Sequence, residues 1–162
     1  MARCLRLTLR NDIKGYITVS DDGLHFPEPK PWTFDDGAEL GSYNTQQHWL
    51  AHRDGLFLIY TRRGANNDHV MRHRAPLFIA EVDAVRLTVK RATERILIPE
   101  LGASYGNFGV CDINEKETWV VETESMRNPK GVIPVDNPWG SKGRVYAARI
   151  LWNKPNRAWD QH

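Results

Sequence analysis

Short stretches in which hydrophobic and polar residues alternate follow one another along almost the whole chain. Each stretch is rich in β-branched and aromatic residues and ends near glycine, proline, asparagine or aspartate, a pattern typical of β-strands separated by turns. The expected strands cover residues 4–10, 15–20, 47–52, 56–63, 76–83, 86–98, 107–113, 118–124 and 144–152. Helical periodicity is almost absent, so the pattern predicts an all-β protein.

The connections between these strands are of two kinds. "HRDG" (52–55) and "NEKE" (114–117) are short enough to be tight hairpin turns between neighbouring strands. The segments 27–45 and 125–143 are much longer and rich in proline, which predicts irregular loops. Long loops on a rigid sheet are where binding groups tend to lie, so we expect a ligand site on this part of the molecule.

Length and composition narrow the class of protein. With 162 residues, of which 41% are hydrophobic, the chain has enough apolar material for one core. We expect a single domain over residues 1–155 and a flexible C-terminal tail over 156–162. The 22 basic and 20 acidic residues nearly balance, which argues against a nucleic-acid partner. We also expect no membrane span and no signal peptide, which leaves the compartment open.

The densest basic stretch, residues 60–74, mixes four arginines with asparagine and aspartate. It fits either a site for one small anion or a solvated loop. Its candidate ligand-binding residues are Arg62, Arg63, Asn67, Asp68 and Arg74. His69 and His73 lie four residues apart, a spacing that suits a metal ion only on a helix. Because the surrounding sequence is typical of a loop, we expect neither a metal site nor a cofactor.

One turn carries more specialised chemistry than a turn needs. The stretch "VSDDGLHF" (19–26) resembles the Asp-box of the sialidase-like superfamily, whose pattern is Ser/Thr-x-Asp-x-Gly-x-Thr-Trp. Asp21 and Gly23 match the pattern and Phe26 stands for the aromatic, whereas the two hydroxyl positions differ. In that family the box is a structural corner of a propeller blade, away from the active site. The resemblance therefore implies a structural role for Asp21, Gly23 and Phe26.

Three further stretches resemble the same family and occur in the same order. They are "NTQQHWLAHRDGLFLIYTRR" (44–63), "HRAPLFIAEVD" (73–83) and "SYGNFGVCDINEKETWVVETE" (104–124). Together with the Asp-box they span most of the chain and match the C-terminal half of a six-bladed propeller. The expected fold is therefore a partial sialidase-like (BNR/Asp-box) propeller. It would contain two and a half to three blades, each of four antiparallel strands.

The resemblance also assigns roles to individual residues. A sialic-acid-like substrate carries a carboxylate, which arginines bind in a charge-assisted, bidentate fashion. By resemblance, Arg74 would be one carboxylate-binding arginine, Arg62 or Arg63 another, and Tyr105 the nucleophile that sialidases use in place of a carboxylate.

Two of these residues also have a structural interpretation. Arg74 could simply form an ion pair with Asp68 or Glu81. Tyr105 could pack as an aromatic residue at the rim of a sheet.

The sequence departs from the family at the catalytic base. A glutamate follows the asparagine that corresponds to Asn44 in the family, whereas this chain has Thr45, Gln46 and Gln47. The first arginine and the acid/base aspartate belong to N-terminal blades that this sequence does not contain. Loss of a general acid or base costs on the order of 10²–10⁴-fold in rate. We therefore expect the blade loops to bind carbohydrate or another ligand without stand-alone hydrolysis.

Two alternatives remain open. The chain could be an exo-sialidase-like glycoside hydrolase that is active only as an oligomer or when N-terminal blades complete it. It could also be a purely structural or protein-interaction module. In each case, three blades in an open arc would leave two apolar faces uncovered, so we expect self-association into a homodimer or a higher oligomer.

Overall fold

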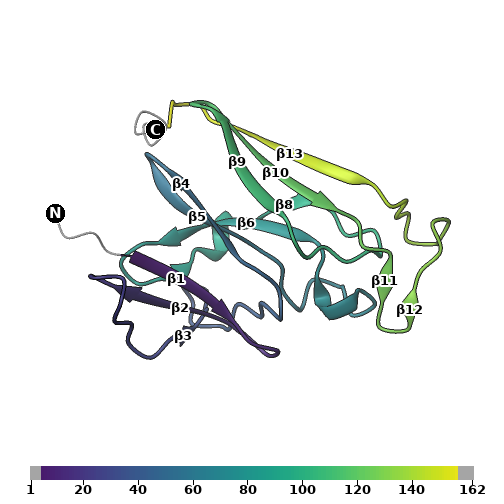
Figure 1. Cartoon of the computed structure of the whole chain (residues 1–162), viewed down its shortest axis with the longest axis horizontal. Helices are drawn as coiled ribbons and strands as arrows, with labels where there is room; N and C mark the ends of the chain where they lie inside the picture. The colour runs from purple at the N-terminus through teal and green to yellow at the C-terminus, as the bar shows by residue number, and fades with distance from the viewer. Residues whose placement is uncertain (1–4, 157–162) are drawn as a thin grey trace.

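A computed structural model describes residues 5–156, and these residues form antiparallel β-sheets with two short 3₁₀ turns (Figure 1). The first sheet contains β1 (Leu5–Arg10), β2 (Gly15–Ser20) and β3 (Lys30–Pro31). The third contains β9 (Gly109–Asn114), β10 (Glu117–Thr123) and β13 (Val145–Leu151), with β10 in the middle. The prediction of an all-β protein is confirmed.

The central sheet is the largest. It is built from β4 (His48–His52), β5 (Gly55–Tyr60), β6 (Leu77–Asp83), β7 (Thr88–Val89) and β8 (Arg95–Ile98). Both β7 and β8 pair with β6, β7 near its end and β8 near its start. A separate hairpin, β11 (Arg127–Asn128) with β12 (Gly131–Val132), and the turns η1 (Met71–His73) and η2 (Arg91–Thr93) complete the fold.

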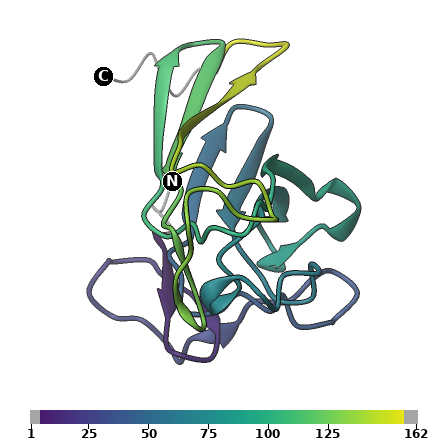
Figure 2. The same ribbon diagram turned by 90° about the vertical axis from the view of Figure 1, so that its right-hand side faces the viewer.

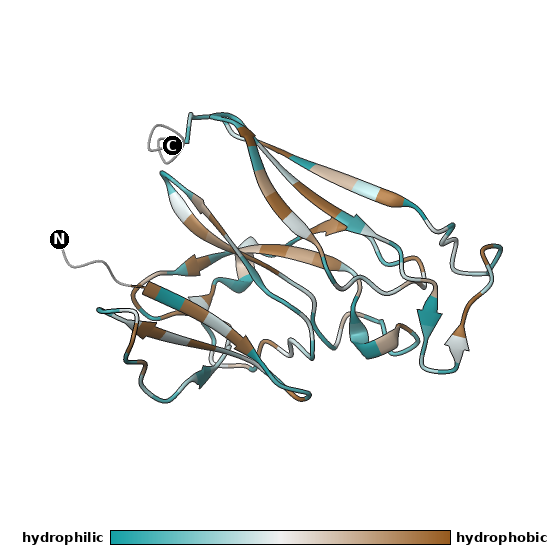
Figure 3. Cartoon of the chain, viewed as in Figure 1, coloured by the Kyte–Doolittle hydropathy of each residue, from teal (hydrophilic) through white to brown (hydrophobic). Residues whose placement is uncertain are grey.

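The three sheets are layered, and the central sheet contributes to a hydrophobic core on each of its faces. One core joins it to the first sheet: Ile17, Trp32, Phe34, Leu40, Leu58, Tyr60, Phe78, Ala80, Val82 and Val89. The other joins it to the third sheet: Leu50, Ile59, Val70, Ala75, Leu77, Ile98, Tyr105, Phe108 and Val120. Successive strand residues point to opposite faces, so Leu58 and Ile59 enter different cores. Hydrophobic and polar positions also alternate along β1 (Figure 3).

All but one of the expected strands correspond closely to strands of the structure, whereas the two-residue strands β3, β11 and β12 lie in segments that were expected to be loops. Residues 86–98 were expected to form one strand, but they form β7, η2 and β8 in succession. Leu87 has a positive φ of 59°, and the Thr93 hydroxyl bonds to the Lys90 carbonyl across η2, at 2.7 Å. Leu87 belongs to the turn between β6 and β7, and η2 separates β7 from β8. Both predicted hairpin turns are present, since His52 pairs with Gly55 and Asn114 with Glu117.

The long segment 27–45 is less loop-like than its composition suggests. Trp32, Phe34 and Leu40 are each at most 2% exposed and belong to the first core. Likewise Asn156, which the sequence places at the start of the tail, is 3% exposed and its Nδ2 donates to the Ala51 carbonyl. The rest of the predicted tail, 157–162, lies outside the described residues.

Within residues 5–156 the strands form layered sheets rather than a closed barrel or a closed ring of blades. The sheets have three, five and three strands, so a regular four-stranded blade is not their common unit. Over the same residues, no helix is long and apolar enough to cross a membrane.

Candidate functional site

At one end of the molecule, which faces the viewer in Figure 2, η1 and the hairpin β11–β12 lie near the end of β10. A cavity of about 550 Å³ lies among residues of these elements. Its lining consists of charged residues (Arg74, Glu122 and Arg127), polar residues (Ser104, Asn107, Thr123 and Ser125), Met71 and Gly106. Ser104 and Ser125 are joined by two backbone hydrogen bonds of 3.0 and 2.9 Å. This bridge fixes the loop before β9 against the chain that leaves β10.

Arg74 follows η1 and brings a guanidinium group to the cavity. Its Nε donates to the Asn44 carbonyl at 3.1 Å, and its Nη2 donates to the same oxygen. Gly106 lies close to this side chain, because a Cβ there would come within 2.8 Å of Arg74 Nη1 and would displace that end of the guanidinium. Burial, and then the positive charges of Arg72 and Arg10, lower the pKa of Arg74. The guanidinium is thus partly desolvated among other cations.

Arg10 reaches the same carbonyl from the first sheet. Its Nη1 donates to the Asn44 carbonyl oxygen at 2.9 Å and to Asn44 Oδ1 at 3.0 Å. Asn44 has a positive φ of 37°, and its amide donates to Asp12. One carbonyl oxygen therefore accepts hydrogen bonds from two guanidinium groups. The guanidinium group of Arg10 therefore lies near that of Arg74, and Asp12 adds a carboxylate to the same Asn44 side chain.

Glu122 supplies the opposing charge and was not among the residues singled out from the sequence. It is 5% exposed, and its carboxylate accepts hydrogen bonds from the backbone of Gly106 at 3.0 Å and of Thr123 at 2.7 Å. Burial raises the pKa of Glu122, although these hydrogen bonds and Arg74 act against the shift. The signal was present in the sequence, because alternation along β10 places Glu122 on the same inward face as Thr118 and Val120.

Arg62, predicted to bind ligand, instead holds a carboxylate of the chain itself. Its Nε and Nη2 donate to the two oxygens of Glu94 at 2.9 and 2.7 Å. The Tyr60 hydroxyl donates to the same carboxylate at 2.6 Å, and the guanidinium lies 4.7 Å from the centre of the Phe78 ring. Arg62 lines a different cavity, of about 470 Å³, so the structure does not bring it together with Arg74.

Arg63 and Asp68 lie on the surface beside the segment that carries Arg74. The Arg63 guanidinium packs 4.1 Å from the centre of the Tyr43 ring. The Asp68 carboxylate is exposed and lies 3.6 Å from His73 Nδ1, so it is not the ion-pair partner that the sequence suggested for Arg74. Glu81, the other suggested partner, contacts Lys90.

Asn67 organises the loop that leads to Arg74. It is fully buried, and its Nδ2 donates to the backbone carbonyls of Arg62, His73 and Ala75. These three bonds pull both ends of the loop around one side chain. Asn67 therefore shapes the site from within, and these contacts favour a positioning role over direct ligand contact.

Tyr105 lies next to the cavity in sequence, but its side chain enters the core. It is fully buried, its hydroxyl donates to the Pro99 carbonyl at 2.6 Å, and burial followed by the neighbouring Tyr146 raises its pKa. Its backbone N–H donates to the Arg74 carbonyl at 2.6 Å, which helps to fix the arginine. The nucleophile assignment stays a prediction, and these contacts favour a packing role.

The turn that resembles an Asp-box lies between β2 and β3. Asp22 Oδ1 accepts hydrogen bonds from the backbone of Leu24 and of His25, both at 2.8 Å. Ser20 Oγ lies 2.9 Å from the same oxygen and also accepts from the Gly23 backbone at 2.9 Å. Gly23 has a positive φ of 77°, which glycine adopts without steric cost. These bonds make the turn a closed local unit.

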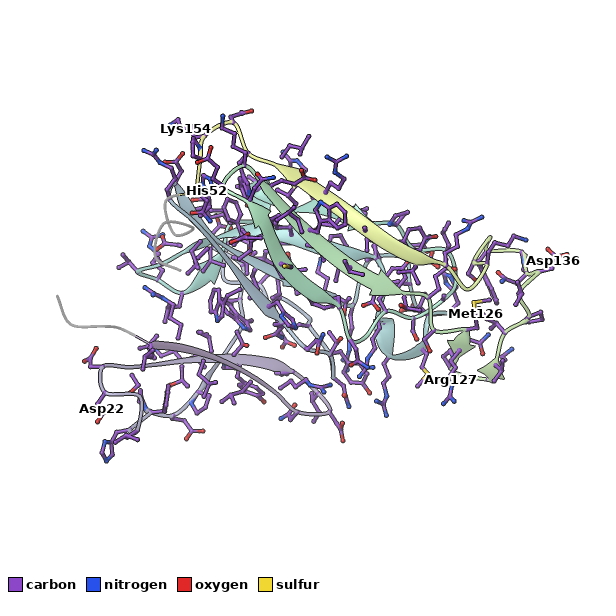
Figure 4. The ribbon with its side chains drawn as sticks, turned by 45° about the horizontal axis from the view of Figure 1, so that its top comes forward. Asp22, His52, Met126, Arg127, Asp136 and Lys154 are labelled. Carbon is purple, nitrogen blue, oxygen red and sulfur yellow. The ribbon has the colours of Figure 1, made fainter. Side chains whose placement is uncertain are left out.

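The residues that organise this turn differ in part from those predicted. Asp21 is exposed, and the carboxylate that binds the backbone is that of Asp22. Phe26 is 37% exposed rather than packed beneath the corner. Asp22 lies at the opposite end of the molecule from Arg127 (Figure 4), so the turn is remote from the cavity.

The pair of histidines considered for a metal has other contacts. His69 Nε2 lies 2.9 Å from Glu100 Oε1, and its ring stacks on Trp139 at 5.3 Å between centroids. Among residues 5–156, no group of three or more His, Cys, Asp or Glu side chains is arranged to hold a metal ion.

Comparison with protein-family models, with curated proteins and with solved structures found no match to this chain. Function must therefore be inferred from the chemistry of the cavity. The guanidinium of Arg74, which shares a carbonyl acceptor with Arg10, and a buried carboxyl group line it, and hydroxyl and amide side chains cover much of the remaining wall.

Proposed function

We propose that the cavity at Arg74 binds an anionic, hydroxyl-rich ligand, and specifically an acidic carbohydrate. The observation that carries the proposal is the partly buried Arg74 guanidinium beside Arg10, because a desolvated cation gains most from an anionic partner. The hydroxyl and amide groups of Ser104, Asn107 and Ser125 could exchange hydrogen bonds with sugar hydroxyls. A wall of this kind suits a polar ligand better than an apolar one.

We also make a proposal about the fold. We regard the three layered sheets as part of a six-bladed sialidase-like propeller, in which neighbouring blades pack face to face around an axis. Support comes from the order of the sheets, which follows the chain, and from the two cores that the central sheet shares with its neighbours. The motif resemblance of the Asp-box turn and of residues 73–83 points the same way.

We propose binding without stand-alone hydrolysis. The amides that replace the family's glutamate are engaged elsewhere, since Gln46 Nε2 donates to the Phe108 carbonyl and Gln47 Nε2 to Ser42 Oγ. The Tyr105 hydroxyl is bonded within the core. Neither arrangement offers an activated nucleophile to a ligand in the cavity.

One observation favours the second candidate, a glycoside hydrolase that is active only when completed by further blades or a second copy. Glu122 is a buried carboxyl group with a raised pKa in a cavity, which is the condition of a general acid. A fluorogenic sialoside assay would test this candidate with Glu122→Gln and Tyr105→Phe. Turnover that is lost with Glu122→Gln would support it, and turnover that survives Tyr105→Phe would remove the nucleophile assignment.

The binding proposal can be tested by calorimetry with the methyl glycoside of N-acetylneuraminic acid and with methyl galactoside as the neutral control. We expect binding of the acidic sugar alone. Arg74→Ala should weaken it roughly 10–100-fold, the value of a charged hydrogen-bonded contact. Arg63→Ala removes an exposed arginine that packs on Tyr43, so its affinity should match wild type. Equal binding of the two sugars, or full affinity in Arg74→Ala, would refute the proposal.

We also propose that the chain self-associates through the outer faces of its first and third sheets. Leu5, Leu7 and Leu9 alternate on the outer face of β1 and are exposed. Val145 and Leu151 are exposed on the outer face of β13, each at 67%. Exposed apolar rows on sheets commonly mark association surfaces.

A further inference from the structure

A second hollow, of about 390 Å³, adjoins the Arg74 cavity on the side of the hairpin β11–β12. Its lining comprises Met71, Arg127, Asn128, Pro129, Gly131 and Val132. Met71 and Arg127 line both spaces, so the hollow and the cavity form one continuous surface. The hairpin is in contact with the segment that carries Met71, because β11 packs beside η1.

The chemistry of the two spaces differs. The hollow presents the thioether of Met71, the ring of Pro129 and the side chain of Val132, which is 79% exposed. The oxygen of its one amide side chain is already engaged, since Asn128 Oδ1 accepts from the Lys130 backbone at 2.9 Å. The hollow therefore offers apolar contact, whereas the adjoining cavity offers charge and hydroxyl groups.

Arg127 lies at the boundary of the two spaces. Figure 4 shows it beside Met126, where the hairpin begins. A guanidinium group is planar, and it can bind an anion at its edge while its face stacks on a flat ring. One side chain at this boundary can thus contact both parts of a ligand that spans the cavity and the hollow.

We propose that the site takes a glycoside of an acidic sugar, with the sugar in the Arg74 cavity and a flat, apolar aglycone in the hairpin hollow. This inference rests on the proposed function and extends it, because it names what is attached to the sugar. The aglycone would lie against Met71 and Val132 and beneath the face of Arg127, and it would remove their apolar surface from water.

The test compares two probes by calorimetry on the whole chain: the methyl and the 4-methylumbelliferyl glycosides of N-acetylneuraminic acid. We expect the aryl glycoside to bind about tenfold more tightly than the methyl glycoside. In Val132→Ser this ratio should fall toward one, while the affinity for the methyl glycoside stays as in wild type. Val85→Ser is the matched control, because Val85 is 91% exposed in the turn after β6 and lines neither space.

The outcomes separate the two proposals. If the methyl glycoside binds in an Arg74-dependent way but the aryl group adds nothing, the hairpin hollow is not a subsite and only the further inference fails. If the aryl preference survives Val132→Ser unchanged, the aglycone lies elsewhere, and the further inference again fails alone. If neither glycoside binds, both proposals fall together.

Discussion

Asn67 shows how one buried amide shapes the loop that carries Arg74. Its Nδ2 contacts three carbonyl groups, of Arg62, His73 and Ala75, in a setting from which water is excluded. An aspartate of the same shape would present an acceptor to these acceptors. It would also bury a charge beside them unless it took up a proton.

We predict that Asn67→Asp lowers the free energy of unfolding by roughly 2–4 kcal/mol, the range for a buried polar network that loses its donors. Urea denaturation would measure the change. Asn66→Asp is the control, because Asn66 is exposed and aspartate tolerates its positive φ of 53°. A similar loss in both variants would mean that Asn67 has no special role.

The shifted pKa of Glu122 predicts a pH dependence with a definite sign. Burial raises this pKa in the folded chain, so above the ordinary glutamate pKa the folded state holds a proton that the unfolded state has released. In that window the contribution of Glu122 to the free energy of unfolding decreases as the pH rises. Lowering the pH from above the folded pKa of Glu122 toward the ordinary glutamate pKa therefore increases the contribution of Glu122 to the free energy of unfolding.

We predict that the difference in free energy of unfolding between wild type and Glu122→Gln shrinks as the pH rises through this window. The comparison cancels the other acidic groups, which both proteins share. Glutamine also places an amide N–H against the backbone N–H of Gly106 or of Thr123. The lost hydrogen bond lowers the free energy of unfolding of the variant by an amount that does not depend on pH. Urea denaturation across the pH series gives the difference directly, and a difference that widens with pH would contradict the assignment.

At the scale of elements, the turn between β2 and β3 depends on one of two adjacent aspartates. Asp22 accepts from two backbone N–H groups, and a hydrogen bond from His25 is the largest of the causes that lower its pKa, followed by the backbone of His25 and of Leu24. Asp21 is exposed beside it. A carboxylate held in this way contributes stability above its unfolded pKa and loses it as the pH falls toward its folded pKa.

We predict that Asp22→Ala lowers the urea midpoint of unfolding, whereas Asp21→Ala leaves it close to wild type. The effect should be present at neutral pH and should fade on acidification, as Asp22 is protonated in the wild type. Equal midpoints for the two variants would show that the turn does not depend on the bonds of Asp22.

Most of the longer strands could be predicted from the sequence because one face of each packs on a core, although the alternating leucines of β1 are exposed. A buried face imposes alternation, and turn residues mark its ends. The segment 86–98 was predicted as one strand because β-branched and apolar residues occur at both of its ends, but its polar middle, residues 90–94, contains η2 and separates β7 from β8. Segment 27–45 was predicted to be an irregular loop because it is rich in proline, although three of its residues, Trp32, Phe34 and Leu40, belong to the first core. Both errors arise where tertiary packing overrides local pattern.

The site was predictable only in part, for a related reason. Arg74 was found because an arginine before a proline-led strand resembles a known motif. Its partners were not found, since the Asn44 carbonyl is 30 residues away from Arg74 and 34 from Arg10. The path of the backbone within one turn also decides that Asp22, and not Asp21 as predicted, accepts the backbone hydrogen bonds of that turn. Such contacts are set by the fold and leave no periodic signal in the sequence.

At the scale of the whole molecule, the layered sheets end in two exposed apolar faces. The inner faces of the first and third sheets each pack on a core: Ile17 of the first sheet belongs to one core and Val120 of the third sheet to the other. Leu7 and Leu151 lie on the outer faces and are exposed at 39% and 67%. If two copies pair so that the β1 face of each meets the β13 face of the other, one two-fold axis covers all four faces.

This arrangement predicts a dimer by size-exclusion chromatography with light scattering at micromolar concentration. Leu7→Lys and Leu151→Lys should each give monomers, because both substitutions weaken the same contact, whereas Val85→Lys should not. Mixing the two monomeric variants should restore a dimer, since one of its two contacts then has both native faces. Pairing of like faces would instead leave one of the variants dimeric on its own. A monomeric wild type would exclude self-association altogether.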